Sequence, residues 1–291
     1  MTRRGWLLFI AMGVIWGLPY LLIKVAVGEL TPATLVFFRT ALSVLLLVPL
    51  AAVRGDLRGL SSYWKPLVAY SLIEVALPWL LLSDAERRLS SSLTGLLVAA
   101  VPLVSAVLAW RTSAHDRLDG RRAGGLVLGF VGVAALVGLD VQVRDFGAVG
   151  EVLIVTVCYA VGPMIVARRL SSLPPVGVVA VSMVLTALIY APPGLAQMPA
   201  RMPSAAAVGA VAGLAVVCTA VAFVVFFALI AEVGPTRATV ITYINPAVAL
   251  LLGVVLLREP LTIGAVAGFA LILVGSLFTT RRTRVSSAAA A

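Results

Sequence analysis

Two charged side chains lie inside otherwise apolar stretches of the sequence, and they are its strongest candidates for chemistry. Arg39 falls in the stretch 32–53, and Glu74 falls in the stretch 65–83. Counting about 1.5 Å per helical residue puts both at nearly the same depth of a membrane core about 30 Å thick. A charge at that depth is costly unless it faces the protein interior or water. We therefore expect Arg39 to hold a substrate carboxylate, or Glu74 to exchange a proton or counter-charge. A permanent Arg39–Glu74 bridge that only orders the helices is an equally open interpretation.

Five aromatic side chains with a polar edge accompany these charges, mostly away from the membrane interfaces where such residues usually anchor a helix. They could line a binding cavity, although ordinary packing is the simpler explanation for any single ring. The five are Trp16, Tyr20, Trp79, Tyr159 and Tyr243. Asn245 is the strongest uncharged polar candidate for substrate contact beside them.

Two prolines are expected to interrupt helices near the middle of the membrane. Pro102 and Pro246 each remove a backbone donor and free the carbonyl four residues earlier, that of Val98 or Thr242. The resulting kinks could act as hinges or present carbonyls to a substrate, and a static kink is equally compatible with the sequence. Pro102 and Pro246 are therefore the hinge candidates.

The sequence offers no constellation for catalysis or metal binding. Its single histidine, His115, precedes Asp116 in a loop, and its two cysteines, Cys158 and Cys218, lie in apolar stretches. These residues lack the partners and spacing of a hydrolase, a disulfide framework or a metal site. No nucleotide-binding motif is present either. We expect neither an enzyme nor a cofactor.

An apolar composition places these residues in lipid. Of the 291 residues, 62% are hydrophobic and only 12% are charged, more apolar surface than a soluble core of this size could bury. Five stretches without charged residues are each near or above the roughly 20 residues that cross a bilayer, and five weaker stretches bring the number of predicted helices to ten. The predicted fold class is an all-α integral membrane protein. The ten stretches are 5–23, 32–53, 65–83, 89–110, 123–139, 149–167, 170–200, 206–230, 238–257 and 260–280.

The net charge of +10 indicates orientation rather than nucleic-acid binding, because the basic residues lie in short loops between the predicted helices. With the N-terminus inside, fifteen of them fall on the cytoplasmic side. This bias and the even number of helices predict a protein of the cytoplasmic membrane with both termini in the cytoplasm. Lys24, near the outer edge, is expected to extend its amine to the surface. The basic residues of the outer side are Arg87, Arg88, Arg144, Arg201 and Arg258.

The sequence repeats itself at an offset of about 143 positions. A duplicated unit with five crossings places its second copy upside down, an arrangement from which many secondary transporters build a central site. We expect two inverted five-helix repeats, residues 1–140 and 147–281, followed by a disordered cytoplasmic tail at 282–291. The repeat is carried by Trp16-Gly17, Pro32, Pro49, Pro102, Gly125 and Gly132, which return as Tyr159-Ala160, Pro175, Pro192, Pro246, Gly268 and Gly275.

Glycine pairs mark possible close contacts between helices. Gly125 and Gly129 in the predicted fifth helix, and Gly264 and Gly268 in the tenth, have the spacing that lets helix backbones approach. The two helices could pack against each other or against a second subunit, and glycine is also common in membrane helices without such a role. Monomer and homodimer both remain open.

A set of these residues resembles a known family. The set comprises Trp16-Gly17, Arg39 after Pro32, Pro102, Pro246 and the ending Arg258-Glu259-Pro260-Leu261 followed by Gly264, Gly268 and Gly275. Together they resemble the EamA family of the drug/metabolite transporter superfamily. The resemblance implies ten helices in two inverted repeats, and outward movement of small metabolites, often amino acids. The sequence departs from the pattern where Tyr159-Ala160 replaces a tryptophan-containing pair and where His115 stands near the position matching Glu259. Ser182 replaces Arg39 in the second repeat, so the predicted site is not symmetric.

The sequence therefore predicts a secondary transporter that exports small metabolites by alternating access through a cavity between the repeats. Its expected partners are a small-molecule substrate and membrane lipids, with no nucleic acid. A channel-like or sensory membrane protein shares the hydrophobicity and is the alternative, although paired mid-helix prolines in a duplicated unit fit alternating access better.

Overall fold

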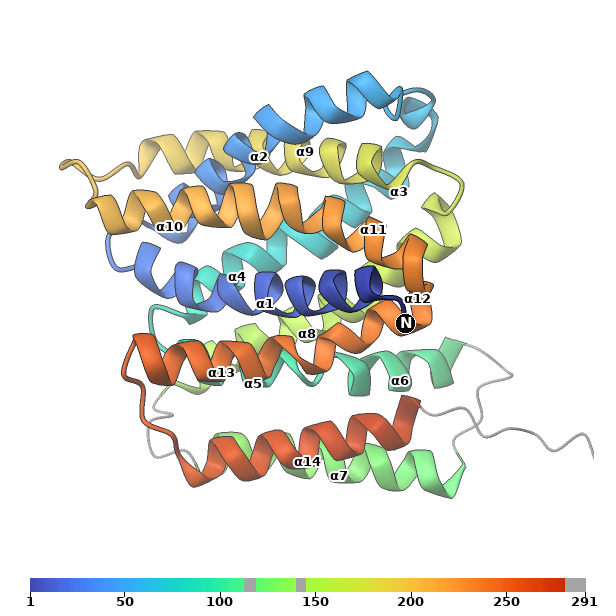
Figure 1. Cartoon of the computed structure of the whole chain (residues 1–291). Coiled ribbons are helices and arrows are strands. Elements are labelled where there is room, and N and C mark those ends of the chain that lie inside the picture. The colour runs from blue at the N-terminus through green and yellow to red at the C-terminus, as the bar shows by residue number, and fades with distance from the viewer. Residues whose placement is uncertain (113–118, 140–144, 281–291) are drawn as a thin grey trace, which may run out of the picture.

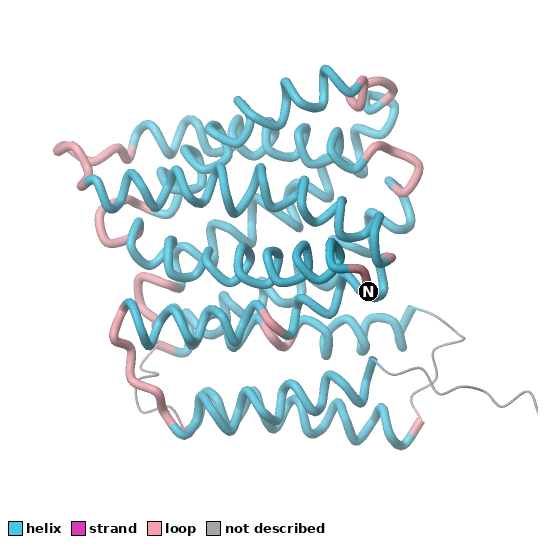
Figure 2. The backbone as a smooth tube through the Cα atoms, viewed as in Figure 1, coloured by secondary structure: helices cyan, strands magenta, loops and turns pink. Residues whose placement is uncertain are grey.

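The computed structural model describes residues 1–112, 119–139 and 145–280, and within these ranges the regular secondary structure is entirely helical (Figures 1 and 2). The helices lie side by side with their axes roughly aligned, and short loops join them at two opposite ends (Figure 2). His115 and the tail at 282–291 fall outside the described residues.

The first half of the chain alternates long helices with interrupted ones. A π-helical segment, η2, lies within the third helical stretch between α3 and α4. The elements are α1 (Arg3–Ala26), α2 (Pro32–Arg54), η1 (Leu60–Tyr63), α3 (Trp64–Tyr70), η2 (Ser71–Ala76), α4 (Leu77–Ala85), α5 (Ser91–Val98), α6 (Val101–Thr112) and α7 (Gly120–Gly138).

The second half has the same order of long and interrupted helices. Two further π-helical segments occur here: η3 continues α8, and η4 lies between α10 and α11. The elements are α8 (Phe146–Ile165), η3 (Val166–Leu170), α9 (Pro175–Ala196), α10 (Ala205–Ala215), η4 (Val216–Val221), α11 (Ala222–Val233), α12 (Pro235–Ala238), η5 (Thr239–Tyr243), α13 (Asn245–Leu256) and α14 (Ile263–Thr280).

Eight helical stretches of the described chain are long and apolar enough to cross a membrane, and two shorter apolar helices, Val240–Leu256 and Ile263–Thr279, follow them. Several begin at a polar side chain that satisfies the first free backbone N–H groups, as expected for a helix N-terminus. Before α2, for example, Thr31 Oγ1 accepts from Thr34 N at 3.3 Å, and Pro32 occupies the first turn. The prediction of a multi-pass all-α membrane protein is thus supported.

The two hinge candidates, Pro102 and Pro246, each lie beside a break between two helices. α5 ends at Val98 and α6 begins at Val101, so Pro102 lies in the first turn of α6; likewise Pro246 lies in the first turn of α13. Proline is tolerated there because the first helical N–H groups need no partner within the helix. The sequence located both breaks, and whether they move remains a prediction.

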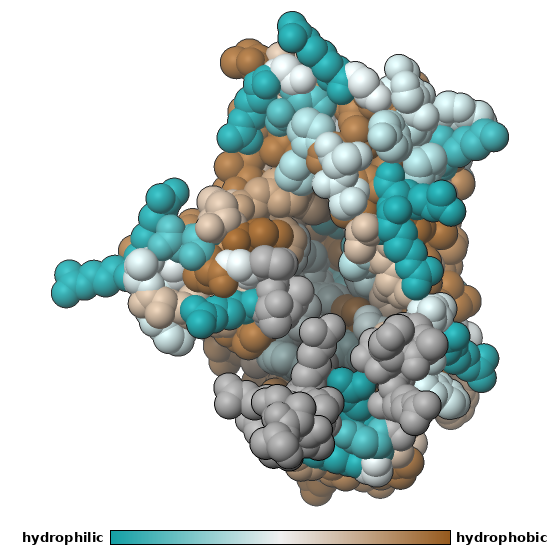
Figure 3. Space-filling model, turned by 90° about the vertical axis from the view of Figure 1, so that its right-hand side faces the viewer, coloured by the Kyte–Doolittle hydropathy of each residue, from teal (hydrophilic) through white to brown (hydrophobic). Residues whose placement is uncertain are grey.

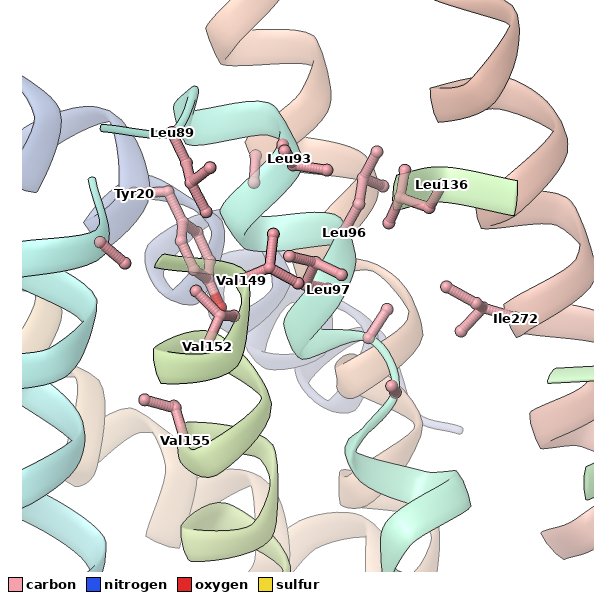
Figure 4. Close-up of a cluster of buried hydrophobic side chains, with 14 of the residues drawn as sticks. Tyr20, Leu89, Leu93, Leu96, Leu97, Leu136, Val149, Val152, Val155 and Ile272 are labelled. Carbon is pink, nitrogen blue, oxygen red and sulfur yellow. The ribbon is translucent and has the colours of Figure 1, made fainter. Parts of the chain in front are cut away.

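A core of buried side chains joins the two halves. Figure 4 shows Tyr20 of α1 and Leu93 and Leu97 of α5 meeting Val149 and Val152 of α8. The last helices of the two halves, α7 and α14, form a separate pair at one edge of the molecule (Figure 1).

Glycines bring α7 and α14 together within one chain. A Cβ at Gly275 would lie 2.5 Å from the Gly125 carbonyl oxygen, and one at Gly132 would lie 2.8 Å from the Gly268 carbonyl oxygen. Such distances leave no room for a side chain, so these helices touch through their backbones. Of the two contacts left open by the sequence, the structure forms the one between the helices themselves.

Candidate functional site

α2 brings Arg39 into the interior of the bundle, where it is only 6% exposed. The guanidinium carbon lies 3.4 Å from the centroid of the Trp79 ring in α4, and Nε donates to Thr219 Oγ1 in η4 at 3.2 Å. The Thr219 hydroxyl in turn donates to the Leu214 carbonyl at 2.8 Å. Among the described residues, the terminal guanidinium nitrogens have no hydrogen-bond partner. The site therefore holds a planar cation with unused donors.

This arrangement is suited to an anionic group. An indole face offsets part of the free energy of a buried cation, about 2 kcal/mol when the pair is desolvated. It does not replace the hydrogen bonds that the terminal nitrogens would make in water. A carboxylate can accept two parallel N–H bonds from a guanidinium. Arg39, Trp79 and Thr219 together can thus position a carboxylate-bearing ligand.

Glu74 lies on the neighbouring element η2 and packs against α8. A Cβ at Gly162 would overlap the Glu74 carboxylate, so the absence of a side chain there makes room for it. Within the described part of the chain, Glu74 Oε2 is sealed and has no hydrogen-bond partner. Tyr70 and Tyr159 are near enough to interact electrostatically with it.

Arg39 and Glu74 do not form the permanent bridge that the sequence left open. Both residues are described, and no ion pair joins them. Tyr159 of α8 is near enough to interact electrostatically with both charges. The structure thus brings Arg39, Glu74, Trp79 and Tyr159 into one region while keeping the acid and the guanidinium apart.

Two of the three π-helical segments in the described chain, η2 and η4, carry Glu74 and Thr219. η2 and η4 are separated by 145 positions, and Glu74 and Thr219 are the fourth residue of each. π-helical turns leave backbone groups in need of partners and occur often at functional sites. Tyr190 Oη donates to the Ala76 carbonyl at 3.0 Å, and Ser43 Oγ donates to the Ala215 carbonyl at 3.1 Å. The last residue of η2 and the residue before η4 are therefore each held by a hydroxyl from the second helix of the other half.

The remaining aromatic candidates lie around this centre in different roles. Trp16 packs against Phe226 and Phe223 of α11, with ring centroids 4.7 and 6.1 Å away. Tyr20 is buried in the core of Figure 4, where its ring lies against Leu89 and Val152. Tyr243 is half-buried in η5, just before the break at α13.

Asn245 joins the break before α13 to the first helix. Its amide nitrogen can donate to the carbonyls of Ile241 at 3.0 Å and Gly13 at 3.2 Å, in the orientation that its surroundings favour. α1 approaches α13 closely at this level, since a Cβ at Gly17 would lie 3.0 Å from the Asn245 carbonyl oxygen. The amide thus bridges backbone groups of η5 and α1.

The bundle is hollowed on one face. Figure 3 looks at the face where α1 begins and shows a central depression rimmed by hydrophilic side chains. Arg39 is the eighth residue of α2, which begins on the opposite face, and Trp79 lies six residues before the end of α4 on that face (Figure 1). The candidate site is therefore nearer to the end opposite the depression.

Polar contacts close that opposite end. Arg88 donates to Asp145 at 3.0 Å and to Glu151 at 2.6 Å, which ties the end of α4 to the start of α8. Hydrogen bonds to Glu151 and Asp145 raise the pKa of Arg88, and the Ala148 N–H, followed by Arg88, lowers the pKa of Asp145. Glu29 accepts from Ser204 N at 2.7 Å, and its hydrogen bonds to Ser204 lower its pKa.

Lys24 does not reach for the surface as the sequence suggested. Its Nζ turns to the turn between α4 and α5, where it donates to the carbonyls of Glu86 at 2.6 Å and Leu89 at 2.7 Å. The Glu86 carbonyl belongs to the C-cap of α4 and the Leu89 carbonyl to the turn that follows, and carbonyls without a helical partner attract a cation. Sequence reasoning missed this contact, together with Thr219 and Gly162. At the offset of 143 positions that pairs Arg39 with Ser182, Glu74 pairs with Val217, two residues before Thr219, so the repeat did not indicate Thr219.

The chain matches the EamA-like transporter family twice, over residues 3–138 and 148–281. It is 23% identical over 286 residues to a protein of Archaeoglobus fulgidus named an uncharacterized transporter, covering 96% of this chain and 99% of that protein. It is 24% identical over 296 residues to the uncharacterized transporter YvbV of Bacillus subtilis, covering 99% and 95%. A solved crystal structure shares the fold at a TM-score of 0.68 and 19% identity, covering 96% of this chain and 97% of that one. The chain therefore belongs to the EamA-like transporter family, part of the drug/metabolite transporter superfamily, and is a multi-pass membrane transporter rather than an enzyme.

Proposed function

We propose that this protein is a secondary carrier that exports a small carboxylate-bearing metabolite, such as an amino acid or a related compound. Ten helices form two inverted five-helix repeats in the cytoplasmic membrane, with both termini in the cytoplasm. Substrate binds between the repeats at Arg39 and reaches each side in turn by alternating access. No nucleotide is hydrolysed.

One observation carries the substrate class: the buried Arg39 guanidinium lies over Trp79 with its terminal nitrogens unpaired among the described residues. A substrate carboxylate supplies the missing acceptors and neutralises a charge that lipid and protein leave uncompensated. Glu74, whose Oε2 has no hydrogen-bond partner in the described part of the chain, would receive a substrate ammonium group or a proton. The two charges therefore favour substrates that carry a carboxylate, with or without a positive group.

The pairing of elements supports the inverted arrangement. The π segments η2 and η4 begin 145 positions apart, close to the repeat offset of 143, and hydroxyls from the second helix of the other half donate to the last residue of η2 and to the residue before η4. α1 runs away from the hollowed face, whereas α8, its equivalent in the second half, runs toward that face (Figure 1). Opposite directions of equivalent helices are what an inverted repeat requires.

Transport into membrane vesicles by the purified protein tests the proposal. A panel of amino acids and other small metabolites, with and without a carboxylate, is compared for saturable uptake. We expect uptake only of carboxylate-bearing compounds, and its loss in Arg39→Ala and Arg39→Lys, because an ammonium cannot replace a planar two-donor contact. Glu74→Gln is expected to change substrate preference or pH dependence.

A control keeps the test specific. Arg201→Ala removes an exposed arginine from a loop and should transport as the unchanged protein does. Equal saturable uptake in Arg39→Ala would overturn the site. Ohmic conductance in place of saturable, competed uptake would overturn the carrier and favour a channel.

A further inference from the structure

The turn between α4 and α5 is held from both halves of the chain. On one side, Lys24 of α1 donates to the carbonyls of Glu86 and Leu89. On the other, the Glu259 carboxylate accepts from Ser91 N at 2.7 Å and Ser92 N at 2.9 Å. Glu259 follows α13 in the second half, whereas the turn belongs to the first. The contacts thus join the two halves at the end opposite the hollow.

The same turn seals an acid away from water. Glu86 is fully buried, and both carboxylate oxygens lack a hydrogen-bond partner among the described residues. The hydroxyls of Ser91 and Ser92 are also buried without partners. α13 closes over them without a side chain at Gly253, where a Cβ would overlap the Glu259 carboxylate and the Ser92 hydroxyl. Buried polar groups without partners destabilise the conformation that contains them.

A cation, a tyrosine and a second carboxylate surround Glu86. Lys24 and Tyr20 face it from α1, and Glu259 faces it from the loop after α13. Glu86 lies just beyond the membrane-spanning stretch Leu60–Ala85. Burial raises its pKa well above the ordinary value, Lys24 opposes that rise, and Glu259 adds to it. Asp84, Asp145 and Glu151 belong instead to the exposed cluster around Arg88.

We propose that Lys24, Glu86 and Glu259 form the outer gate of the carrier, which is shut in this structure and opens when Lys24 leaves the two carbonyls and water reaches Glu86. The gate rests on the proposed carrier function and orientation. Lys24 holds the gate shut, because its ammonium group joins α1 to the turn. Glu259 holds the turn to the second half through backbone N–H groups at the start of α5. The buried Glu86 carboxyl disfavours the shut state, because its missing hydrogen bonds would be supplied by water when the gate opens.

The gate is therefore sensitive to the pH outside. In the shut state the pKa of Glu86 is raised, and in the open state the hydrated carboxyl has its ordinary pKa. The shut state binds the proton more tightly, so its advantage is fully present below the ordinary glutamate pKa. The advantage of the shut state is lost as the external pH rises toward the raised pKa of Glu86. Alkaline conditions outside should open the gate.

Thiol labelling from outside tests the gate without needing a substrate. The reporter is Ser92→Cys in a background in which Cys158 and Cys218 are replaced by serine. Ser92 is 5% exposed, and its hydroxyl has no partner among the described residues, so the reporter breaks no hydrogen bond. A membrane-impermeant maleimide is added to intact cells, and the labelling rate reports how often the gate opens.

Three variants give distinct expectations. Lys24→Met should accelerate labelling roughly tenfold, the factor expected from losing hydrogen bonds to a charged donor. Lys24→Arg, which keeps the charge and the donors, should restore slow labelling. Glu86→Gln should remove the increase in labelling between about pH 5 and about pH 8, a range above the ordinary glutamate pKa. The ratio of unchanged protein to Glu86→Gln at each pH cancels the pH dependence of the thiol reaction.

The chain contains its own matched controls. Lys65 is the only other lysine and lies near the start of α3, and Arg201 is an exposed basic residue in the loop after α9. Lys65→Met and Arg201→Ala should leave the labelling rate unchanged. If Lys24→Met labels no faster while folding normally, or if Glu86→Gln keeps the full pH response, the gate is overturned. Should Lys24→Met fail to fold, Lys24→Arg and the pH response of Glu86→Gln still decide.

Failure of the proposed function gives a different result. Labelling that follows these expectations, without saturable transport of any carboxylate, would leave the gate in place and reject the carrier. Labelling only from the cytoplasmic side would reject the orientation, and with it an outer gate.

Discussion

Thr219 matters because it is the acceptor that the structure gives to the Arg39 guanidinium. Replacing it with valine keeps the shape of the side chain and removes the hydroxyl that accepts from Nε at 3.2 Å. The guanidinium then loses its fixed orientation over Trp79, and a carboxylate must reorient it on binding. We expect the KM of the transported carboxylate to rise about tenfold, the effect of one charge-assisted hydrogen bond.

Thr186 of α9 provides the control for that change. It is buried, and its hydroxyl has no hydrogen-bond partner among the described residues. Thr186→Val removes an unsatisfied polar group, so it should leave the KM unchanged and should not lower the melting temperature. A similar KM increase in both variants would mean that the Thr219 hydroxyl acts only through packing.

Gly162 sets the position of Glu74. In Gly162→Ala the new methyl group must displace the Glu74 carboxylate, which is the flexible end of its side chain. We therefore expect a folded protein with altered transport, resembling Glu74→Gln rather than an unfolded variant. Gly150→Ala, on the same helix with nothing within 4 Å of the added methyl, should transport normally. Unaltered transport by Gly162→Ala would separate Glu74 from the site.

The sequence suggested the charged and aromatic members of the proposed site but not the contacts that fix their positions. Arg39 and Glu74 could be found because charges in apolar stretches are rare and need a reason. Thr219 gave no such signal, since placing a threonine in a membrane helix costs little free energy. Lys24 was assigned to the surface because its position along α1 was known but not its direction. The carbonyls that attract it belong to a turn 62 to 65 residues away.

At the level of elements, α7 and α14 depend on backbone contact. A Cβ at Gly275 would meet the Gly125 carbonyl oxygen at 2.5 Å and Gly129 N at 2.5 Å. A side chain can change its rotamer to avoid a new methyl group, but backbone atoms cannot. Gly275→Ala must therefore move the two helices apart. We expect it to destabilise the protein by about 1–3 kcal/mol, the usual effect of overpacking. Thermal unfolding in detergent measures the change.

Gly138, near the end of α7, offers the comparison. A Cβ there meets nothing within 4 Å, so Gly138→Ala should be neutral or slightly stabilising through helix propensity. If Gly275→Ala and Gly138→Ala melted at the same temperature, close packing between α7 and α14 would not contribute to stability.

Interrupted helices show which elements a sequence can predict. Proline produced a signal at both breaks, because the missing donor and fixed backbone angle act locally. The π segments η2 and η4 produced none, because Ser71–Ala76 and Val216–Val221 contain neither proline nor glycine. Their extra residue is tolerated through hydroxyls donated by Tyr190 and Ser43 from helices distant in sequence. Local propensity cannot predict a conformation that depends on such partners.

For the whole molecule, inversion of the two halves makes a sharp prediction about two equivalent arginines. Arg58 follows the second helix of the first half, and Arg201 follows the second helix of the second half, 143 positions later. Both are exposed in loops. Inverted repeats put them on opposite sides of the membrane, whereas repeats of the same orientation would put them on one side.

Single cysteines at the two positions measure this directly, in a background without Cys158 and Cys218. An impermeant maleimide added to intact cells should label Arg201→Cys and not Arg58→Cys, and inside-out vesicles should give the reverse, because basic residues concentrate in cytoplasmic loops. Labelling of both cysteines from one side would contradict the inversion and, with it, a site shared between opposed repeats. Opposite labelling with the sides exchanged would keep the inversion but place the hollowed face outside, which would turn the gate at Lys24 and Glu86 toward the cytoplasm.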